Sequence, residues 1–496
     1  MLNSLKMCGK ADACNVEGDK IVMGKLRTII KTDIPGAKFT YAKLKMAKEH
    51  LMIPIGMYYL WKLFHTLDSK CVIESPANIE KLNYKDMFYL HYALNSQDYN
   101  RFMENIISSN LNSLKKAEQV KISFILYDSS MWCGDYLYQL LRNDPLFDVE
   151  VVLSKRSDMI SDTAEKAFQE GANKLKEAGL NIRVINSGDS YVADADILFF
   201  LTPYFNVLNS GLSLENLSVT KLICYVDYGI EISNGGTATD ILMRKFIWKE
   251  FVDTESHLRD IQEKTYRKGA GEIYTGYPRM DTFYMADKPK YQWKAANPNA
   301  KKFIWAPHWS INDGVLYATF HKNWKFFFEY AKSHPDTTAW VVKPHPNLLD
   351  SAVKTGVFED EKAFSDYLKA WNDLPNAKVE TGAYYQDIFK TSDAMILDSV
   401  SFTSEYMYTH KPELFLTRNT DNFNQVGKDI IDGLYTADGS DFNSIRAFIE
   451  NVVVDGNDVK LNDRENAFKN HLDYYGKFGK LASQRIYDLI RSALGS

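Results

Sequence analysis

The stretch 392-SDAMILDSVSFTSEYMYTHKPELFL-416 decides the fold class. It holds two short apolar runs, Ala394–Leu397 and Glu413–Leu416, and between them Ser401–Thr409, which we expect to be a helix. Apolar strands that alternate with helices form a parallel sheet covered on both faces. The stretch therefore predicts an α/β fold in which polar residues follow a buried strand.

The same alternation continues upstream in two sets. The set nearer the C-terminus has predicted strands at Phe303–Ala306, Thr338–Val342 and Ala377–Val379 and predicted helices at Lys322–Ser333 and Glu361–Trp371. The earlier set has predicted strands at Lys121–Tyr127, Val149–Leu153, Ile182–Ile185, Ile197–Leu201 and Lys221–Val226 and predicted helices at Cys133–Asn143 and Thr163–Ala178. Two such sets predict two Rossmann-like, doubly wound lobes that face a cleft.

The chain therefore divides into three regions. Residues 1–118 are expected to be an extra, mostly helical N-terminal region, residues 119–285 the first, acceptor-binding lobe, and residues 286–496 the second, nucleotide-binding lobe. The polar stretch Asp287–Lys302 is the expected linker, and the last helix, Ala482–Ala493, is expected to cross back to the first lobe. Lys38–His65 mixes lysines with aromatic residues, so it either packs on the neighbouring lobe or makes a peripheral contact with an anionic membrane.

Bulk properties narrow the class of protein. A net charge of -5 over 496 residues argues against a nucleic-acid partner. The five cysteines fit neither a zinc site nor a disulfide framework, and no apolar run reaches the length of about 20 residues that spans a membrane. We therefore expect a cytoplasmic protein, located at the inner face of the cell membrane if the N-terminal region binds lipid.

Several well-known cofactor motifs do not occur in the sequence. It contains no Gly-rich dinucleotide fingerprint, no phosphate loop, no HExxH and no paired CxxC. We therefore expect neither a cofactor nor a bound metal. The remaining candidates are polar residues at the C-terminal ends of strands, where open α/β sheets bind their ligands.

The tetrapeptide Lys343-Pro344-His345-Pro346 follows the predicted strand that ends at Val342. The two prolines restrict the backbone, so Lys343 and His345 are delivered just past a buried strand. A lysine there suits a phosphate, and a histidine can hydrogen-bond a phosphate or a base. The alternative is a rigid turn whose lysine is solvated. The position at a strand end favours a nucleotide-binding role.

Asp398, Ser399, Ser401 and Glu405 follow the strand at Ala394–Leu397. Serines at a helix N-terminus can bind anions, because the backbone N–H groups there are unpaired and the helix dipole is positive. Glu405, about two turns into the helix, would accept hydrogen bonds from ribose hydroxyls. The alternative is ordinary capping of the helix by Asp398 or a serine.

Three further residues are candidates. His308 lies in a loop after a strand and is either catalytic or structural. Arg279 would clamp a phosphate from the hinge side, or pair with Asp281 and fix the lobe junction. In the first lobe, Asp227 follows a strand and would act as general base on an acceptor hydroxyl, or would be an ordinary turn carboxylate.

The sequence resembles the CDP-glycerol glycerophosphotransferase family of teichoic-acid and capsule polymerases. The segments that carry the resemblance are GYPRMD at 276–281, WAPHW at 305–309, KPHP at 343–346 and the stretch 392–412. The resemblance implies a GT-B fold without a required metal, a nucleotide-activated, CDP-linked donor, and a growing surface polymer as acceptor. It also implies that Lys343 and His345 contact the donor, that Ser401 holds phosphate, and that Glu405 meets the ribose.

The sequence departs from the family pattern in three places. Where the family often has Trp-His-Gly, with the histidine proposed as the base, this chain has VDYG at 226–229, so Asp227 is the candidate base by position. The family's Asp-Tyr-Ser-Ser is DSVS at 398–401, and its Thr-Trp-Arg is HWS at 308–310.

These features predict a transferase that moves a polyol phosphate or a sugar from a nucleotide-activated donor to a glycan or glycolipid acceptor, such as a teichoic-acid-like polymer. The departures motivate two alternatives. One is an inverting or retaining nucleotide-sugar glycosyltransferase of capsule or O-antigen synthesis. The other is a non-catalytic glycan-binding subunit with a relic nucleotide pocket.

Overall fold

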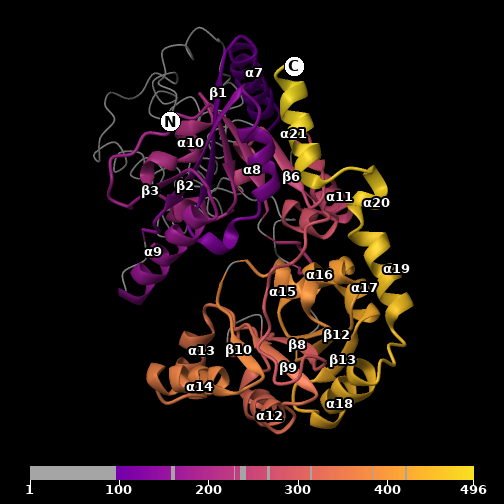
Figure 1. Ribbon diagram of the computed structural model, residues 1–496. Coiled ribbons are helices and arrows are strands. Elements are labelled where there is room, and N and C mark those ends of the chain that lie inside the picture. The colour runs from indigo at the N-terminus through magenta and orange to yellow at the C-terminus, as the bar shows by residue number, and fades with distance from the viewer. Residues whose placement is uncertain are drawn as a thin grey trace, which may run out of the picture.

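The computed structural model describes residues 96–157, 162–227, 229–234, 242–264, 269–312, 316–382, 384–418 and 422–495. Figure 1 shows two lobes, one above the other, each built on its own parallel sheet. The stretch Lys38–His65 lies outside the described residues. Of the predicted helical N-terminal region, the structure describes helix α7 (Ser96–Leu114), which precedes the first strand of the first lobe.

The first lobe contains seven strands. They are β1 (Val120–Leu126), β2 (Phe147–Ser154), β3 (Ile182–Ile185), β4 (Ile197–Phe200), β5 (Leu222–Val226), β6 (Lys249–Val252) and β7 (Glu272–Tyr274). Every pairing is parallel, in the order β3-β2-β1-β4-β5-β6-β7. The order reverses between β1 and β4, which creates a switch point at their C-terminal ends.

The helices of the first lobe connect these strands. They are α8 (Asp135–Arg142), α9 (Asp162–Glu177), α10 (Leu214–Leu217) and α11 (Glu255–Lys264). The predicted strands of this lobe correspond to β1 to β5, with ends that differ by at most two residues. The alternation of apolar strands and amphipathic helices is therefore a sound guide to this part of the fold.

The second lobe contains six strands in a second, wholly parallel sheet. They are β8 (Lys301–Ala306), β9 (Thr338–Val342), β10 (Ala377–Val379), β11 (Ala394–Leu397), β12 (Glu413–Thr417) and β13 (Tyr435–Asp438). Their order is β10-β9-β8-β11-β12-β13, with the switch point between β8 and β11. The predicted α/β fold of two Rossmann-like lobes in the GT-B arrangement is thus confirmed.

The helices of the second lobe cover both faces of its sheet. They are α12 (Phe320–Ser333), α13 (Leu348–Lys354), α14 (Glu361–Asp373), α15 (Gln386–Thr391), α16 (Val400–Tyr406), α17 (Gln425–Gly433) and α18 (Phe442–Ala447). The linker between the lobes is shorter than predicted. Lys301 and Lys302, which we assigned to it, are the first residues of β8 because they pair with β9.

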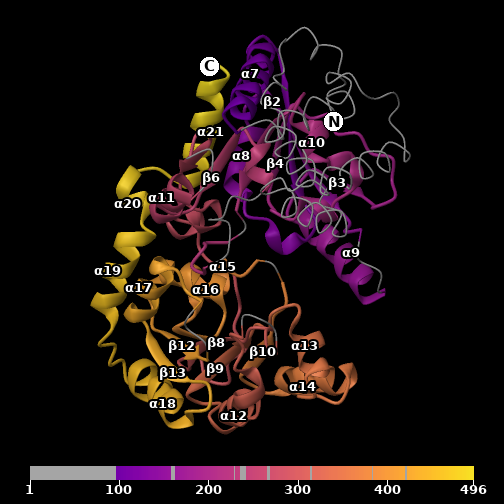
Figure 2. The same ribbon diagram turned by 180° about the vertical axis from the view of Figure 1, so that it is seen from behind.

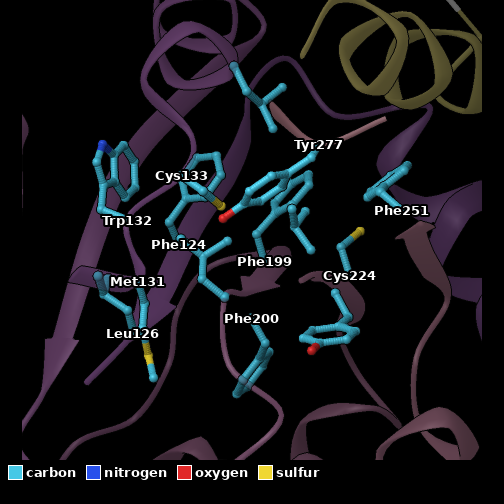
Figure 3. Close-up of a cluster of buried hydrophobic side chains, with 14 of the residues drawn as sticks. Phe124, Leu126, Met131, Trp132, Cys133, Phe199, Phe200, Cys224, Phe251 and Tyr277 are labelled. Atoms are coloured by element: carbon cyan, nitrogen blue, oxygen red, sulfur yellow. The ribbon is translucent and has the colours of Figure 1, made fainter. Parts of the chain in front are cut away.

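Each lobe has its own aromatic core. In the first lobe, the ring of Phe124 stacks on Phe199 with centres 5.0 Å apart and meets Trp132 edge-on at 5.5 Å (Figure 3). In the second lobe, Trp305, Trp340 and Trp371 are almost fully buried, and the ring of Trp371 pairs with each of the other two. Such aromatic pairs add about 0.5–1.5 kcal/mol each beyond simple burial. The two cores therefore support rigid strand ends.

The chain returns to the first lobe at its C-terminal end. Helices α19 (Leu461–His471), α20 (Tyr474–Phe478) and α21 (Ala482–Ala493) run along one side of both lobes in Figures 1 and 2. Tyr487 Oη donates to Asp144 Oδ2 at 2.7 Å, which fixes α21 against the first lobe. The predicted crossing of the last helix is confirmed.

Asp281 caps this returning helix. Its carboxylate accepts hydrogen bonds from Tyr474 Oη and from the backbone N–H groups of Ala482 and Ser483, at 2.7 to 2.8 Å. An anion at the first turn of a helix is favourable because the dipole is positive there. The alternative in which Asp281 pairs with Arg279 is therefore wrong, since the aspartate binds the C-terminal helices.

Candidate functional site

Lys343 follows β9 directly and its side chain is largely buried, with 8% of its surface exposed. Its Nζ donates to the carbonyl oxygen of Gly382 at 2.7 Å and lies 5.9 Å from the centre of the Phe402 ring. Burial lowers the pKa of Lys343 to about 8, although Glu380 opposes the shift. The ammonium is thus mostly charged at neutral pH, in surroundings of low dielectric where it attracts an anion strongly.

The loops that follow β8 and β9 bring His308 and His345 together, with ring centres 5.2 Å apart. Burial, with the neighbouring His345, lowers the pKa of His308 to about 3. Burial and the charge of Lys343 lower the pKa of His345 to about 4. Both imidazoles are therefore neutral across the physiological range.

The hydrogen bonds of the two histidines assign their tautomers. His308 Nδ1 accepts from the backbone N–H of Ser310 at 3.3 Å and lies 2.8 Å from the hydroxyl oxygen of the same residue, which can donate to it. His345 Nδ1 accepts from the backbone N–H of Asn347 at 3.1 Å. A neutral ring with an accepting Nδ1 carries its proton on Nε2. Each ring can therefore donate a hydrogen bond from Nε2 to an anion. Their low pKa values make both rings weak general bases near neutral pH.

Asp398 supports the His308 loop. Its carboxylate is 1% exposed and accepts from the backbone N–H of His308 and of Thr319, both at 2.5 Å, and from Thr319 Oγ1 at 2.7 Å. Burial raises the pKa of Asp398 to about 6, so it is mainly ionised at neutral pH. The geometry gives Asp398 a positioning role, because its oxygens hold the loop after β8 in place.

Ser399 and Ser401 lie at the start of α16, and both are partly exposed. Gly229 of the first lobe faces this start: a Cβ placed at Gly229 would lie 3.6 Å from Ser401 Oγ. The first-lobe loop that contains Asp227 therefore approaches the second-lobe loop that contains Ser401. The structure brings the strand-end loops of the two lobes together at this point.

A buried chain of hydrogen bonds links the lobes through Arg279. The guanidinium donates from Nη1 to Tyr385 Oη at 2.6 Å and from Nη2 to the first-lobe carbonyl oxygens of Ser130 and Trp132 at 2.6 and 2.9 Å. Tyr385 Oη in turn donates to Glu405 Oε2. The terminal nitrogens of Arg279 thus bind the protein itself and hold the opening loop of the first lobe against the second lobe.

Glu405 is buried at the end of this chain. Burial raises its pKa to about 7, while Arg279 and Tyr385 favour the ionised form. The predicted contact with a ribose stays a prediction, as does a phosphate contact by Arg279. Tyr385 was not predicted as a site residue. Nothing in the sequence distinguishes it from the neighbouring Tyr384, because its partner Arg279 lies 106 residues away.

Asp227 lies at the C-terminal end of β5 and is mostly buried. Its Oδ1 accepts from Tyr225 Oη at 2.9 Å. Burial, and next the charge of Asp253, raise the pKa of Asp227 to about 7. A carboxylate with a pKa near neutrality can accept a proton from a substrate hydroxyl more readily than an ordinary aspartate.

A second contact between the lobes was not predicted. Ser233 of the first lobe and Phe423 of the second form an antiparallel bridge, and the backbone N–H of Asn234 donates to the carbonyl oxygen of Asn422 at 2.7 Å. Gly427 is the available signal, because a Cβ there would lie 2.2 Å from a first-lobe carbonyl oxygen. This bridge holds the loop after β5 close to the loop after β12.

Within the described ranges, no three His, Cys, Asp or Glu side chains gather as metal ligands. None of the helices in the described part of the chain is both long and apolar enough to span a membrane. Cys133 and Cys224 are buried free thiols.

Comparison with protein families decides the identity. The family model described as CDP-glycerol:poly(glycerophosphate) glycerophosphotransferase matches residues 227–492, which is more than half of the chain. The chain belongs to this family. It is therefore a glycerophosphotransferase-type transferase, and the resemblance inferred from the four sequence segments is confirmed. The match begins at Asp227 and includes every other candidate residue named above.

No curated protein sequence matches this glycerophosphotransferase-family chain. Solved structures with a similar outline include S. aureus MnaA bound to UDP (14% identity, TM-score 0.49, 76% of this chain and 97% of that one). The UDP-GlcNAc 2-epimerase of Methanocaldococcus jannaschii has 12% identity, a TM-score of 0.48 and coverage of 75% and 99%. A variant of the wall teichoic acid polymerase TagF has 12% identity, a TM-score of 0.47 and coverage of 88% and 98%. Likeness at this level carries no argument about function.

Proposed function

We propose that this family member transfers a polyol phosphate from a CDP-glycerol-like donor to a hydroxyl group of a teichoic-acid-like polymer. One observation carries the proposal. Lys343, His308 and His345 gather at neighbouring strand ends of the second lobe, and the first-lobe loop that follows Asp227 approaches Ser401 at the start of α16. The second lobe offers an ammonium group and two neutral imidazoles as hydrogen-bond donors, and the first lobe offers a carboxylate of raised pKa. This combination suits phosphoryl transfer to a hydroxyl group.

The second lobe would bind the nucleotide-activated donor. The ammonium of Lys343 and the Nε2–H groups of His308 and His345 would bind the oxygens of the donor's diphosphate. Ser399 and Ser401, at the start of α16, would add hydroxyl donors. These groups stabilise the charge that develops on the leaving nucleotide, which departs as CMP. Asp398 keeps His308 in position through its backbone N–H.

The first lobe would bind the acceptor. The acceptor hydroxyl oxygen attacks the phosphorus that carries the polyol, and its proton passes to the Asp227 carboxylate. A new P–O bond forms, and the bond from that phosphorus to the bridging oxygen breaks. The electron pair leaves with CMP, and the product is a phosphodiester. The charges balance, because the proton held on Asp227 returns to water or to the leaving phosphate.

A donor panel tests the proposal. The full chain is incubated with CDP-glycerol, other CDP-polyols, and UDP- and GDP-linked sugars, and the released nucleotide is identified. CMP release that depends on a polymer acceptor supports the proposal. Release of UDP or GDP from sugar donors would make the chain a glycosyltransferase instead. Donor binding without turnover over many acceptors would favour a binding subunit.

Lys343→Met tests the donor site directly. The variant removes the charge and keeps most of the length of the side chain, so the affinity for CDP-glycerol should fall at least about tenfold, as expected for a lost charge-assisted hydrogen bond. Lys369→Ala, at an exposed position on α14, is the matched control and should keep wild-type affinity. Equal affinity of Lys343→Met and wild type would contradict the assignment.

The N-terminal region gives a separate proposal about location. We propose that Lys38–His65 makes a peripheral contact with the inner face of the cell membrane, where a glycolipid acceptor would be presented. Flotation of the full chain with anionic liposomes, compared with a variant in which Lys43, Lys45 and Lys48 are changed to Glu, tests it. Equal flotation of the two chains would remove the idea.

A further inference from the structure

A pocket of about 520 Å³ lies at the junction of the lobes and shares Arg279 with the site above, but none of Lys343, His308 or His345. Its walls come from three segments that lie far apart in the sequence, together with the helical turn Pro278–Phe283, which contains Arg279. The start of α8 contributes Asp135, Tyr136 and Gln139, the linker contributes Asp287, Lys290 and Tyr291, and the segment that begins α15 contributes Tyr384, Gln386 and Asp387. Both lobes and the linker therefore build it.

The charges of the pocket disfavour a phosphate. Asp135, Asp287 and Asp387 line it, together with Lys290. The terminal nitrogens of Arg279 are bound to Tyr385 and to backbone carbonyl oxygens, so they do not offset these carboxylates at the pocket surface. Carboxylates outnumber accessible cations, and a phosphate chain brought here would be repelled.

The remaining lining groups favour a sugar ring. Tyr384 lines the pocket, and 42% of its surface is exposed. A tyrosine ring can pack against the apolar face of a sugar while its hydroxyl stays solvated. The amides of Gln139 and Gln386 and the carboxylates can bind neighbouring hydroxyl groups, since amides both donate and accept and carboxylates accept.

We propose that this pocket binds a neutral or amine-bearing sugar unit of the acceptor. The proposal rests on the proposed function as far as the acceptor is concerned. Phosphate groups are held on the Lys343 side of Arg279 and Tyr385, and a sugar unit is held on the pocket side. The acceptor would thus be recognised by two kinds of chemistry at once, which distinguishes a polymer with sugar units from a pure phosphate chain.

Direct binding tests the pocket. Ligand-observed NMR on the full chain uses methyl glycosides of glucose, N-acetylglucosamine and glucosamine as probes, with glycerol 3-phosphate and cytidine as comparisons. We expect a glycoside to bind, and its affinity to fall at least about tenfold in Tyr384→Ala and in Asp287→Asn, the loss of a stacking or hydrogen-bonding contact. Tyr475→Ala, at a tyrosine that is 40% exposed outside the pocket, and Asp336→Asn are the matched controls.

The outcomes separate the pocket from the transferase activity. Turnover of CDP-glycerol with no glycoside binding, or with glycoside binding that the pocket variants leave unchanged, overturns the pocket proposal alone. Loss of cytidine binding in the variants also overturns it, because the pocket would then hold the donor base. Glycoside binding that the variants weaken, in a chain that turns over no CDP-linked donor, keeps the pocket and removes the proposed function.

Discussion

Asp227 gives the sharpest test of the proposed chemistry, because its pKa of about 7 fixes the pH dependence of the reaction. If the ionised carboxylate is the base, kcat/KM follows the ionised fraction in the free enzyme. That fraction is about one tenth at pH 6 and about nine tenths at pH 8, so kcat/KM should rise about tenfold between them. Asp227→Asn should lower the plateau by about 10²–10⁴, the usual contribution of a general base.

Tyr225 supplies an internal control for this prediction. Its hydroxyl donates to Asp227 Oδ1 at 2.9 Å and therefore stabilises the ionised form. Tyr225→Phe removes that donor, so the pKa of Asp227 should rise and the ascending limb of the profile should move to higher pH. The plateau should be nearly retained, because the carboxylate itself is still present. A residue with a merely structural role would change the height of the profile without moving its limb.

The assay measures CMP release between about pH 6 and pH 9 with CDP-glycerol and acceptor below their KM values, so that the rate reports the free enzyme. Thermal melts of each variant confirm folding. Two results would refute the reasoning. One is an Asp227→Asn variant that keeps the wild-type kcat/KM. The other is a limb at the same pH in Tyr225→Phe and wild type, because the titrating group would then not be Asp227.

Three further predictions concern stability and access. Both carboxyl oxygens of Glu413 are buried without a hydrogen-bond partner, and burial raises its pKa well above the usual 4.5. A raised pKa penalises folding as pH rises above about 4.5. Glu413→Met should therefore raise the free energy of unfolding, measured by urea titration, by about 1–3 kcal/mol at pH 7 and by less near pH 4. No gain at pH 7 would contradict this. Asp398→Asn should place an amide donor against a backbone N–H, lower the free energy of unfolding by about 1–3 kcal/mol and lower kcat through the His308 loop; wild-type stability would argue against the positioning role. Gly229→Ala should fold normally, because its Cβ would be in ordinary contact with Ser401, and should raise the KM for the donor; an unchanged KM would place the donor elsewhere.

The central strands of both sheets could be predicted from the sequence because they are apolar and buried on both faces. Thr338–Val342 and Ala394–Leu397 have the predicted ends to the residue. The strands β6, β7 and β13 were missed because each carries charged residues. In β6, Glu250 is buried in a pair with Arg244, whose Nη2 and Nε lie 2.7 Å from its two carboxyl oxygens. In a sequence, a charged residue indicates an exposed position, because the buried partner that neutralises it is not apparent.

The positions of the site residues could be predicted, but their partners could not. The rule that ligands bind at strand ends led to the loops of Lys343, His308 and Ser401, and the structure brings these loops together. Arg279 was expected to bind a phosphate or Asp281. Its terminal nitrogens bind Tyr385 and two carbonyl oxygens of the protein, and the phosphate contact stays a prediction. Periodicity reports the local environment of a residue and contains no information on a partner more than a hundred positions away.

The protonation states of the site follow from the same geometry. Burial lowers the pKa of Lys343 to about 8 and raises the pKa of Glu405 to about 7, because each charge loses its water. The attraction between the two side chains opposes both shifts without cancelling them. An anion placed beside Lys343 would reverse the first shift and enlarge the second, since negative charge favours the protonated form of both groups. Binding of a diphosphate would therefore draw protons onto the second lobe while Asp227, in the first lobe, must give up its own to act as base. Because the site is divided between two lobes, the carboxylate that gains a proton, Glu405, and the carboxylate that must lose one, Asp227, are different residues.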